Sequence, residues 1–525
     1  MSQAGSNGGD ERKRAQRKQR VQVVRAAMSG AEIVQLPARS GGGDPPGGGG
    51  HGNGEVVRLL DVENHWNAAG TIIATDFLRD GHCVLGRHLG DFYRFDYARG
   101  GWRQFNDEWL VKHVYAAVDA SHHRSKDGLV PCRATQRLVG SVAHAIAHRV
   151  LLDEQLERPA WLPPHDPQQL VPEHPPATEF LAVQNGLLHL PSGVLWPSTP
   201  AFFGLTASPV PWLEDPPEPT RWLAFIDEVF DGDTQAVESF QEGLGYSISL
   251  DTSQQKIFVL HGQPRSGKGT LLRVITAIVG LDNVCHPSLA SLADKFGLAP
   301  LIGRSIAIIG DARLGSKSDH AEVLQNLLRI SGEDRVDVAR KHRGSWSGLL
   351  RVRFWMALNE LPQIQDVSNA LASRLVVFNC NQCFEGREDT ELTGKLRAEL
   401  PGILRWAVIG WQRLRERGRF LQPESAAETI ASYREATSET QAFVARHCVI
   451  APGHRVERRA VYEVYCRFRE EEGFEGKVSA PKFGKRLLEI CRGAVKTEQV
   501  RKDGTRKWFY VGIRLRDPKQ DDFFD

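Results

Sequence analysis

The sequence predicts an α/β fold built around a mainly parallel β-sheet. Strand-like apolar runs recur at 257–260, 305–310, 351–358 and 375–379, with helical patterns between them. Alternation of this kind indicates parallel strands flanked by helices. The first run leads into a glycine-rich loop, and a helical run, Leu271 to Ile278, follows the loop. We therefore expect a strand, loop and helix to form one unit at the centre of the chain.

This loop has the spacing of a phosphate-binding loop. It reads Gly262, Gln263, Pro264, Arg265, Ser266, Gly267, Lys268, Gly269 and Thr270. Glycines let a backbone pass close to phosphates, and the N-terminus of the next helix offers N–H groups and the positive end of its dipole. Lys268 adds a point charge suited to β- and γ-phosphates. The G-x4-G-K spacing with these flanks predicts a nucleotide site rather than an ordinary strand-to-helix turn.

The composition is that of an ordinary globular chain. The 525 residues are 41% hydrophobic and 25% charged, and the formal net charge is only +2. Any nucleic-acid site must therefore be local. The cysteines are thinly spread, which fits a reducing cytosol, and the pair Cys380 and Cys383 has no second pair to complete a zinc site. Because no apolar run reaches the length of a membrane helix, we expect no membrane span and a cytoplasmic protein.

The chain before the loop divides into three segments. Residues 1–54 are glycine-rich with a basic cluster, which predicts a disordered tail, and a solvated tail is favoured over DNA contact. Residues 55–177 indicate a mixed α+β region, with strands at 92–95 and 102–105 and a helix capped by Asn106 or Asp107. Residues 178–255 start with a hairpin around Asn185-Gly186 and continue with two helices. Four histidines lack companion ligands and indicate surface or core positions rather than a metal site: His122, His123, His144 and His148.

The C-terminal region, residues 440–516, predicts a winged-helix unit. Helices at 459–471 and 481–490 precede strands at 497–501 and 507–511. Between Pro481 and Arg516 there are eleven Lys and Arg against three Asp and Glu. A local charge of this size can bind a DNA backbone by counterion release, and a solvated face is the alternative. Residues 517–525 form an acidic tail.

Four features between the loop and residue 380 suit nucleotide chemistry. Asp311 ends the second strand, where a carboxylate can hold Mg²⁺ and orient water. Asn359 ends the third strand, where an amide can position water at a γ-phosphate. Arg374 precedes the fourth strand and can act on the nucleotide of a neighbouring subunit. A turn, Ser331 to Asp334, opens a hairpin whose basic tip suits a nucleic-acid backbone: Arg340, Lys341, His342 and Arg343. Each feature alone has an ordinary structural alternative.

In this order the features resemble the helicase core of superfamily 3 AAA+ proteins. Within that superfamily they resemble the phage and plasmid primase–helicase branch, which is related to poxvirus primase–helicases. The resemblance covers about residues 60 to 515 and is strongest over 256–380. It rests on Gly262-x4-Gly267-Lys268, Asp311, Ser331-Gly332-Glu333-Asp334 with Arg340-Lys341, Leu358-Asn359-Glu360-Leu361-Pro362, and Arg374.

The resemblance implies a ring, usually a hexamer, that moves along single-stranded and forked DNA using ATP. It implies an AAA+ core over 256–420, a domain before it over 178–255, and a winged-helix end. By position, Lys268 binds phosphate, Asp311 serves Mg²⁺ and water, Asn359 senses the γ-phosphate and Arg374 is the finger. Three hairpin residues lie where the family's hairpin faces DNA: Arg340, Lys341 and His342. A separate primase is a possible partner.

The chain departs from the family pattern in three ways. Gly269 follows Lys268 where most such loops have a Mg²⁺-binding Ser or Thr, so either Thr270 takes that role or Asp311, phosphate and water hold the metal. The acid ending the second strand is Asp311 where this branch usually has Glu, which we expect to slow hydrolysis. The region before residue 178 shows no primase catalytic set, so primer synthesis is not predicted.

Two other functions compete with a helicase. One is an origin-binding or packaging ATPase that assembles on DNA without processive unwinding. The other is a small-molecule kinase, because nucleoside kinases also carry the sequence Gly267-Lys268-Gly269-Thr270. A kinase leaves Asn359 and Arg374 without a role, and no lid or acceptor-site pattern follows the loop.

Overall fold

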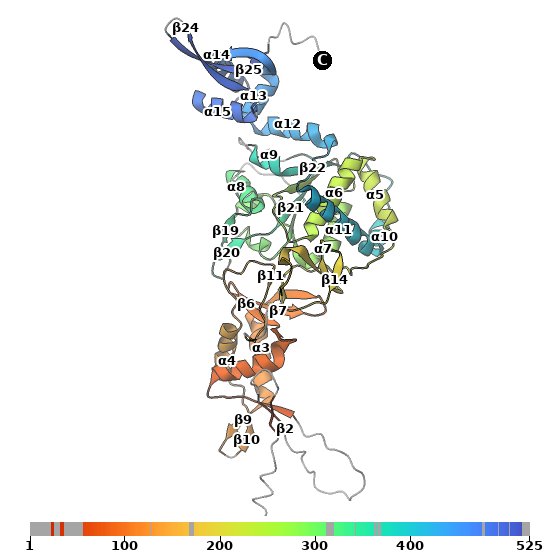
Figure 1. Ribbon diagram of the computed structural model, residues 1–525, viewed down its shortest axis with the longest axis vertical. Helices are drawn as coiled ribbons and strands as arrows, with labels where there is room; N and C mark the ends of the chain where they lie inside the picture. The colour runs from red at the N-terminus through yellow and green to blue at the C-terminus, as the bar shows by residue number, and fades with distance from the viewer. Residues whose placement is uncertain are drawn as a thin grey trace, which may run out of the picture. The chain divides into compact units, whose positions relative to one another are not determined.

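The computed structural model describes residues 23–25, 32–35 and 56–516, except 127, 167, 169–172, 311–319, 342, 362–363, 365–368, 475–477, 492 and 503–504. The chain forms two compact units (Figure 1). Unit 1 takes the residues up to Pro175 together with Thr199–Leu205, and unit 2 takes Pro176–Ser198 and the residues from Thr206 onward. Within the described part of the chain, no helix is both long and apolar enough to cross a membrane.

In its described residues, unit 1 combines antiparallel hairpins with three helices. Strands β6 (Leu85–His88), β7 (Asp91–Asp96) and β8 (Gly101–Phe105) form an antiparallel sheet, which confirms the predicted pairing of 92–95 with 102–105. The predicted helix cap is also confirmed, because Asn106 accepts a hydrogen bond from the backbone N–H of Trp109. The helices are α2 (His65–Ile72), which continues into the π-helical segment η1 (Ile73–Phe77), α3 (Asp107–Asp119) and α4 (Gln136–Arg149).

A second sheet of unit 1 extends into the segment expected to be disordered. Its order is β1 (Val23–Arg25), β2 (Glu32–Gln35), β3 (Val56–Leu59), β9 (Ser121–Ser125) and β10 (Gly128–Pro131). The β-branched residues of β1 and β2 favour an extended backbone, and β3 offers β2 a strand to pair with. The rest of residues 1–54 lies outside the described residues.

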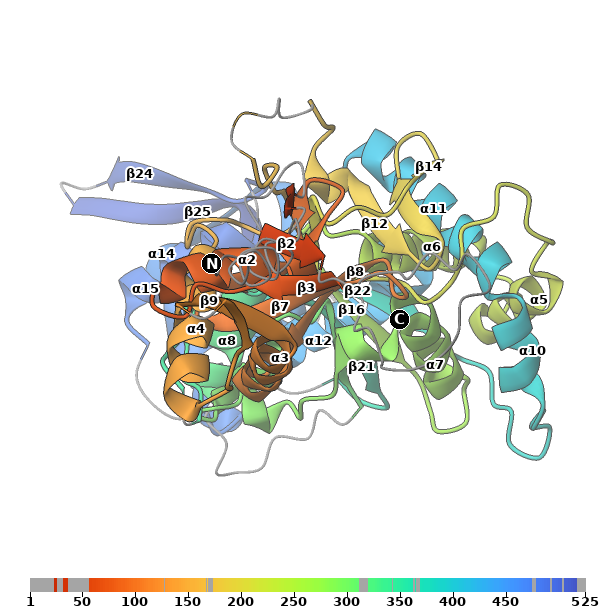
Figure 2. The same cartoon turned by 90° about the horizontal axis from the view of Figure 1, so that it is seen from below.

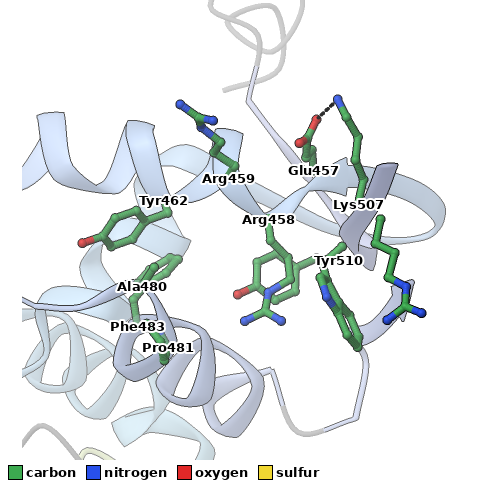
Figure 3. Close-up of a pocket in the computed structure, with 11 residues that line it drawn as sticks. Glu457, Arg458, Arg459, Tyr462, Ala480, Pro481, Phe483, Lys507 and Tyr510 are labelled. Atoms are coloured by element: carbon green, nitrogen blue, oxygen red, sulfur yellow. Dashed lines mark hydrogen bonds and ion pairs between the residues drawn. The ribbon is translucent and has the colours of Figure 1, made fainter. Parts of the chain in front are cut away.

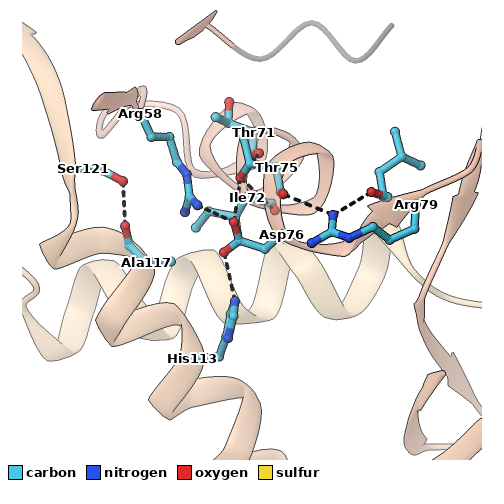
Figure 4. A network of polar contacts seen from close by, with 10 residues as sticks. Arg58, Thr71, Ile72, Thr75, Asp76, Arg79, His113, Ala117 and Ser121 are labelled. Atoms are coloured by element: carbon cyan, nitrogen blue, oxygen red, sulfur yellow. Dashed lines mark hydrogen bonds and ion pairs between the residues drawn. The ribbon is translucent and has the colours of Figure 1, made fainter. Parts of the chain in front are cut away.

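A carboxylate in the π-helical segment ties three elements of unit 1 together (Figure 4). Asp76 accepts hydrogen bonds from Arg58 of β3, from Thr75 Oγ1 at 2.8 Å and from His113 Nε2 of α3 at 2.9 Å. Burial raises the pKa of Asp76, but the hydrogen bond from His113 and the charge of Arg58 outweigh it, so the pKa lies below its ordinary value. The ionised carboxylate therefore stabilises this junction.

Unit 2 contains the predicted parallel sheet. Its spatial order is β17 (Val284–Cys285), β18 (Ile306–Ile309), β21 (Arg353–Leu358), β16 (Ile257–His261) and β22 (Leu375–Asn379), and all four pairings are parallel. Four of these strands match the four predicted apolar runs, which confirms the α/β fold. The strands are buried on both faces, as parallel strands usually are. In the core, the ring of Phe258 stacks on that of Trp355 with centroids 4.5 Å apart.

Two groups of elements lie on opposite sides of this sheet (Figures 1 and 2). One side carries α5 (Thr220–Phe230), α6 (Thr234–Ile248), α10 (Leu392–Ala398) and α11 (Leu400–Arg417), and the other carries α8 (His320–Ser331) with the hairpin of β19 (Arg335–Val338) and β20 (Trp346–Leu349). Helices α6 and α11 approach so closely that a Cβ on Gly245 would lie 2.3 Å from the carbonyl oxygen of Ala407. The buried carboxylate of Glu242 pairs with Arg413 at 2.8 Å and with Arg417, both on α11.

The segment before the parallel sheet contains the predicted hairpin. Strands β12 (Phe180–Val183) and β13 (Gly186–His189) pair antiparallel around Asn185, and β14 (Val194–Trp196) adds a third strand. The side chain of Asn185 exchanges hydrogen bonds of 2.8 Å with the backbone of Trp212. The two predicted helices are α5 and α6, and the apolar residues of α5 that recur at helical spacing are buried in the core: Trp222, Phe225, Ile226 and Val229.

The C-terminal part of unit 2 has a core of its own. Helices α13 (Glu439–His447), α14 (Arg458–Glu471) and α15 (Ala480–Ile490) pack with a three-stranded antiparallel sheet. The two predicted strands exist as β24 (Lys496–Lys502) and β25 (Thr505–Leu515), and their pairing confirms the predicted hairpin. A third strand, β23 (Cys448–Glu457), was not predicted. It pairs with β25 despite a register shift between Ile450 and Arg455.

Candidate nucleotide site

The glycine-rich loop joins β16 to helix α7 (Lys268–Val279), as its sequence predicts. Gly267 is the N-cap of α7 and has φ of 87°, a backbone conformation that glycine adopts without strain. The side chain of Lys268 is buried and turns back into the loop. Its Nζ donates to the carbonyl oxygens of Gly262 and Gln263 at 2.7 Å each and to Ser266 Oγ at 3.1 Å. The ammonium group therefore lies inside the loop, where it can meet an anion.

Neighbouring segments leave the loop no room for side chains at two glycines. A Cβ on Gly262 would lie 2.2 Å from the carbonyl oxygen of Cys380, and one on Gly267 would lie 2.8 Å from Val229 Cγ2. The carbonyl oxygen of Arg265 accepts a hydrogen bond of 2.9 Å from the backbone N–H of Phe384. These contacts fix the loop in shape, so its backbone N–H groups are pre-organised at the start of a helix, as an anion site requires.

Asn359 lies next to this loop. Strands β16 and β21 are parallel neighbours with His261 opposite Leu358, and the N–H of Gly262 donates to the carbonyl oxygen of Leu358 at 3.1 Å. Gly262, the first residue of the loop, follows His261, and Asn359 follows Leu358, so the two lie side by side. Asn359 is exposed. The strand before Asp311, β18, is the next one along and ends at the same edge of the sheet. Asp311 itself lies outside the described residues, and its role remains a prediction.

Arg374 lies at the amino-terminal ends of the strands, opposite the edge of the sheet that carries the loop. It ends α9 (Ala370–Arg374) directly before β22, where Leu375 pairs with Ile257 at the start of β16. The far end of the same pairing, Asn379 with His261, is four residues away, or roughly 13 Å along the strands. Because the loop begins only beyond His261, the side chain of Arg374 cannot reach the loop of its own chain.

The guanidinium of Arg374 contacts the end of helix α8. It donates to the carbonyl oxygen of Leu328 and to Ser331 Oγ, the latter at 2.8 Å. Burial lowers the pKa of Arg374, while Asp334 opposes that shift. The adjacent turn is anchored as well, since Gln255 Nε2 donates to the carbonyl oxygen of Gly332 at 3.3 Å and Thr252 donates to Glu333.

This turn leads into the predicted hairpin, which confirms the two strands. Along β19 the side chains alternate, with Val336 and Val338 buried and Arg335 and Asp337 exposed. Arg340 Nε donates to the carbonyl oxygen of Gly344 at 2.9 Å across the tip, and Lys341 is exposed there. Arg343 is exposed as well, and His342, also predicted at the tip, lies outside the described residues. The tip can offer positive charge to an anionic backbone.

Thr270 lies on another side of the helix start. Its Oγ1 accepts a hydrogen bond of 2.8 Å from Arg273 Nη2, one turn further along α7. Both residues line a cavity of about 550 Å³ that also borders His286 and Arg397. Of the loop residues before Gly269, none lines this cavity. The hydroxyl of Thr270 is therefore engaged by the guanidinium of Arg273.

The sequence pattern alone did not point to three residues that shape this site. Arg273 has a detectable signal, because a basic side chain three residues after Thr270 lies on the same helix face. Ser331 was noted only as part of a turn, and Cys380 only as half of a cysteine pair. Cys380 instead follows β22 directly and packs its carbonyl group against Gly262, and burial raises the pKa of its thiol to about 12. Among the described residues, no group of three or more His, Cys, Asp or Glu side chains is placed to hold a metal ion.

Comparison with known proteins gives one family match and several distant structural matches. Residues 260–374 match a family of unknown function, DUF5906. No curated protein matches the chain. The A form apo structure of the NrS-1 C-terminal region aligns with a TM-score of 0.44 and 12% sequence identity, covering 82% of this chain and 95% of that chain. Another apo structure of the same region has a TM-score of 0.42 at 12% identity, covering 82% and 96%. The family match thus runs from the end of β16 to Arg374.

Proposed function

We propose that this protein is an ATP-dependent DNA helicase of superfamily 3 AAA+ type. It acts in replication of a phage, plasmid or integrated mobile element, as a ring of identical subunits on single-stranded DNA. The finer fold assignment is part of the proposal: an AAA+ core over 256–420 and a winged helix over 440–516. The observation that carries it is the sheet register, which supports Asn359 beside the phosphate loop and Arg374 at the other edge.

The loop residues fit a nucleoside triphosphate with Mg²⁺. Gly267, with φ of 87°, opens helix α7 at the end of the loop, and the Nζ of Lys268 already donates to loop oxygens where phosphate oxygens can replace them. Lys268 and the N–H groups at the start of α7 would hold the phosphates, and Asn359 would orient the attacking water. Mg²⁺, held by Asp311, phosphate oxygens and water, would neutralise charge on the phosphates. Thr270 is a weaker candidate ligand because Arg273 occupies its hydroxyl.

The position of Arg374 supports an assembly of several subunits. An arginine finger stabilises negative charge on the transferred phosphoryl group, and it can come from a neighbouring chain. Arg374 cannot reach its own loop, so in this proposal each nucleotide site is completed by the next copy in a ring, which we expect to be a hexamer. The exposed Lys341, with Arg340 and His342, would then face DNA from the hairpin tip. A separate primase is a further expected partner, and we expect the protein to act in the cytoplasm.

ATP turnover with and without single-stranded DNA, measured beside strand displacement from a forked duplex, tests this function. DNA-stimulated turnover with displacement supports the helicase. Stimulated turnover without displacement favours an origin-binding or packaging ATPase, and transfer of phosphate to a small acceptor without DNA favours a kinase. Lys341→Ala should weaken the stimulation by DNA. Lys395→Ala is the matched control, since Lys395 pairs with Asp389 at 3.0 Å on the surface of α10.

A further inference from the structure

The C-terminal part of unit 2 contains a cavity of about 390 Å³ between its β-hairpin and its helices (Figure 3). Residues of β25, the start of α14 and the start of α15 line it. They include three arginines and four aromatic side chains: Arg458, Arg459, Arg506, Tyr462, Phe483, Trp508 and Tyr510. The volume lies in the range of small-ligand pockets. The lining therefore combines positive charge with flat apolar surface.

Trp508 is the most exposed aromatic residue of this cavity. Its side chain is 45% exposed, whereas that of Tyr510 is 1% exposed. The two residues are two apart on β25 and therefore share one face of the strand. Single exposed apolar side chains are common on protein surfaces. Trp508 differs because it borders a cavity, with Arg506 on the same face of its strand and Gln499 opposite it on β24.

Arg458 fixes the floor of the cavity. Its guanidinium lies 5.3 Å from the ring centroid of Tyr510 and 5.8 Å from that of Trp508. A cation at this distance from a ring is attracted by the ring quadrupole. Tyr462 is held in place too, because its hydroxyl donates to the carbonyl oxygen of Val478 at 2.6 Å. The aromatic walls are thus positioned before any ligand binds.

The charge around the cavity favours an anionic ligand. The carboxylate that lines it, Glu457, is paired with Lys507 at 3.2 Å (Figure 3). The remaining charged groups of the lining are cationic. Arg459 is 83% exposed and pairs with Glu463 on the surface at 2.9 Å, so it can turn toward a ligand. The start of α15, at Ala480 and Pro481, adds the positive end of a helix dipole.

We propose that this cavity binds one unpaired nucleotide of single-stranded DNA, with the base stacked on Trp508 and the phosphate near Arg459 and Arg506. Stacking on an indole requires a base with a free face, which single strands offer and duplexes do not. The inference rests on the proposed DNA helicase activity for its partner. It adds a second DNA contact, in the C-terminal part, that recognises bases rather than backbone alone.

Binding of labelled oligothymidylate, compared with an abasic strand of equal length, tests the stacking. The titrations use fluorescence anisotropy on the full chain without ATP. Trp508→Ala should weaken binding of oligothymidylate by about 5- to 100-fold, the range expected for one stacked base, and should leave binding of the abasic strand unchanged. Trp508→Phe should retain most of the affinity because it keeps an aromatic ring.

Trp66→Ala is the matched control. Trp66 is 50% exposed in unit 1 and lies beneath Arg149, whose guanidinium carbon is 4.3 Å from the ring centroid. This variant should bind both strands like the wild type. Equal affinity of Trp508→Ala and wild type for oligothymidylate would overturn the proposal. An equal loss on both strands would also overturn it, because it would show a general electrostatic or folding defect.

A photochemical measurement on the wild type covers the case in which Trp508→Ala does not fold. Irradiation with a strand containing 5-iodouracil should yield a tryptic peptide, Trp508 to Arg514, linked to DNA. Linkage found only at the hairpin tip near Lys341 would contradict the cavity site. The two proposals fail separately: unwinding without Trp508-dependent binding refutes only the cavity, and Trp508-dependent binding without ATP-driven displacement refutes only the helicase.

Discussion

The two edges of the parallel sheet gather different chemistry. At the carboxyl edge, the loop after β16 presents backbone N–H groups and Lys268, with Asn359 beside it. At the amino edge, Arg374 donates hydrogen bonds to Leu328 and Ser331 at the end of α8. One edge is shaped to accept an anion, and the other holds an arginine that cannot reach the loop of its own chain. In the proposed function, a single chain therefore carries both halves of a site that only a neighbouring copy can complete.

The largest expected effect comes from the carboxyl edge. Lys268→Ala should lower the rate of ATP turnover by about 10³-fold or more and should weaken ATP binding. Removal of one preorganised donor alone typically lowers kcat by about 10²–10³-fold. Turnover is measured by phosphate release, and ATP affinity by equilibrium binding. Lys395→Ala should change neither quantity. Normal turnover by Lys268→Ala would mean that the loop does not hold the phosphates.

Removing the arginine at the amino edge should separate binding from turnover. Arg374→Ala should lower turnover by about 10³-fold, as expected for a finger, while leaving ATP affinity within about threefold. The reason is that Arg374 lies away from its own loop and, in the proposed ring, acts on a phosphate held by another chain. A loss of ATP affinity as large as that of Lys268→Ala would contradict the comparison of the two edges.

Asn359 should rank third. Asn359→Ala should lower turnover by about 10- to 100-fold with ATP affinity retained, because an oriented amide positions water rather than holding the nucleotide. The matched control is Asn185→Ala, since Asn185 also follows a buried strand of unit 2 but bonds only the backbone of Trp212. Pre-steady-state phosphate release measures the effect on the chemical step directly. Equal turnover of both variants would remove Asn359 from the site.

Loss of the hydrogen bond between Arg374 and Ser331 should have a smaller, local effect. Ser331→Ala removes the hydroxyl that accepts a hydrogen bond of 2.8 Å from Arg374. The free energy of unfolding should fall by about 1 kcal/mol. Faster amide hydrogen exchange at the end of α8 reports that loss. Ser373→Ala is the control, because its hydroxyl bonds only the carbonyl oxygen of Ala370. Unchanged exchange in Ser331→Ala would show that the contact with Arg374 adds no stability.

Thr270 should give the smallest effect. Because its hydroxyl accepts from Arg273, Thr270→Ala should change turnover by less than about threefold, under 1 kcal/mol of barrier. Asp311→Asn should be far more harmful if Asp311 holds the metal. Titration of turnover with Mg²⁺ distinguishes the two residues: a raised Mg²⁺ requirement in Thr270→Ala would instead make its hydroxyl a metal ligand.

The sequence could predict the central sheet because its strands are buried on both faces. Such strands are continuous apolar runs, so 257–260 and 375–379 stand out in the chain. Strand β17 has only two residues and leaves no pattern. Strand β23 contains Pro452-Gly453 and alternates poorly, and it becomes a strand only because β25 pairs with it across a register shift. Tertiary pairing of that kind overrides local preference.

The sequence could predict those residues of the candidate site that directly precede or follow a strand. The loop, Asn359 and Arg374 each adjoin a strand, so the strand order places them at one edge or the other. Contacts between distant segments left no such signal. The bond from Arg374 to Ser331 and the cavity around Trp508 each join residues that lie in separate elements. The roles of Asp311 and His342 stay predictions, since both lie outside the described residues.

Mixing of two inactive variants tests the central claim most directly. Lys268→Ala lacks the loop cation but keeps a sound Arg374, and Arg374→Ala has the reverse defect. If each site is completed by a neighbouring chain, some mixed interfaces will combine an intact loop with an intact finger. We therefore predict that turnover reappears when the two proteins are mixed and peaks near equal amounts. Turnover that stays at the level of the separate variants at every ratio, with mixed assembly confirmed, would contradict the claim that the two edges of the sheet meet between subunits.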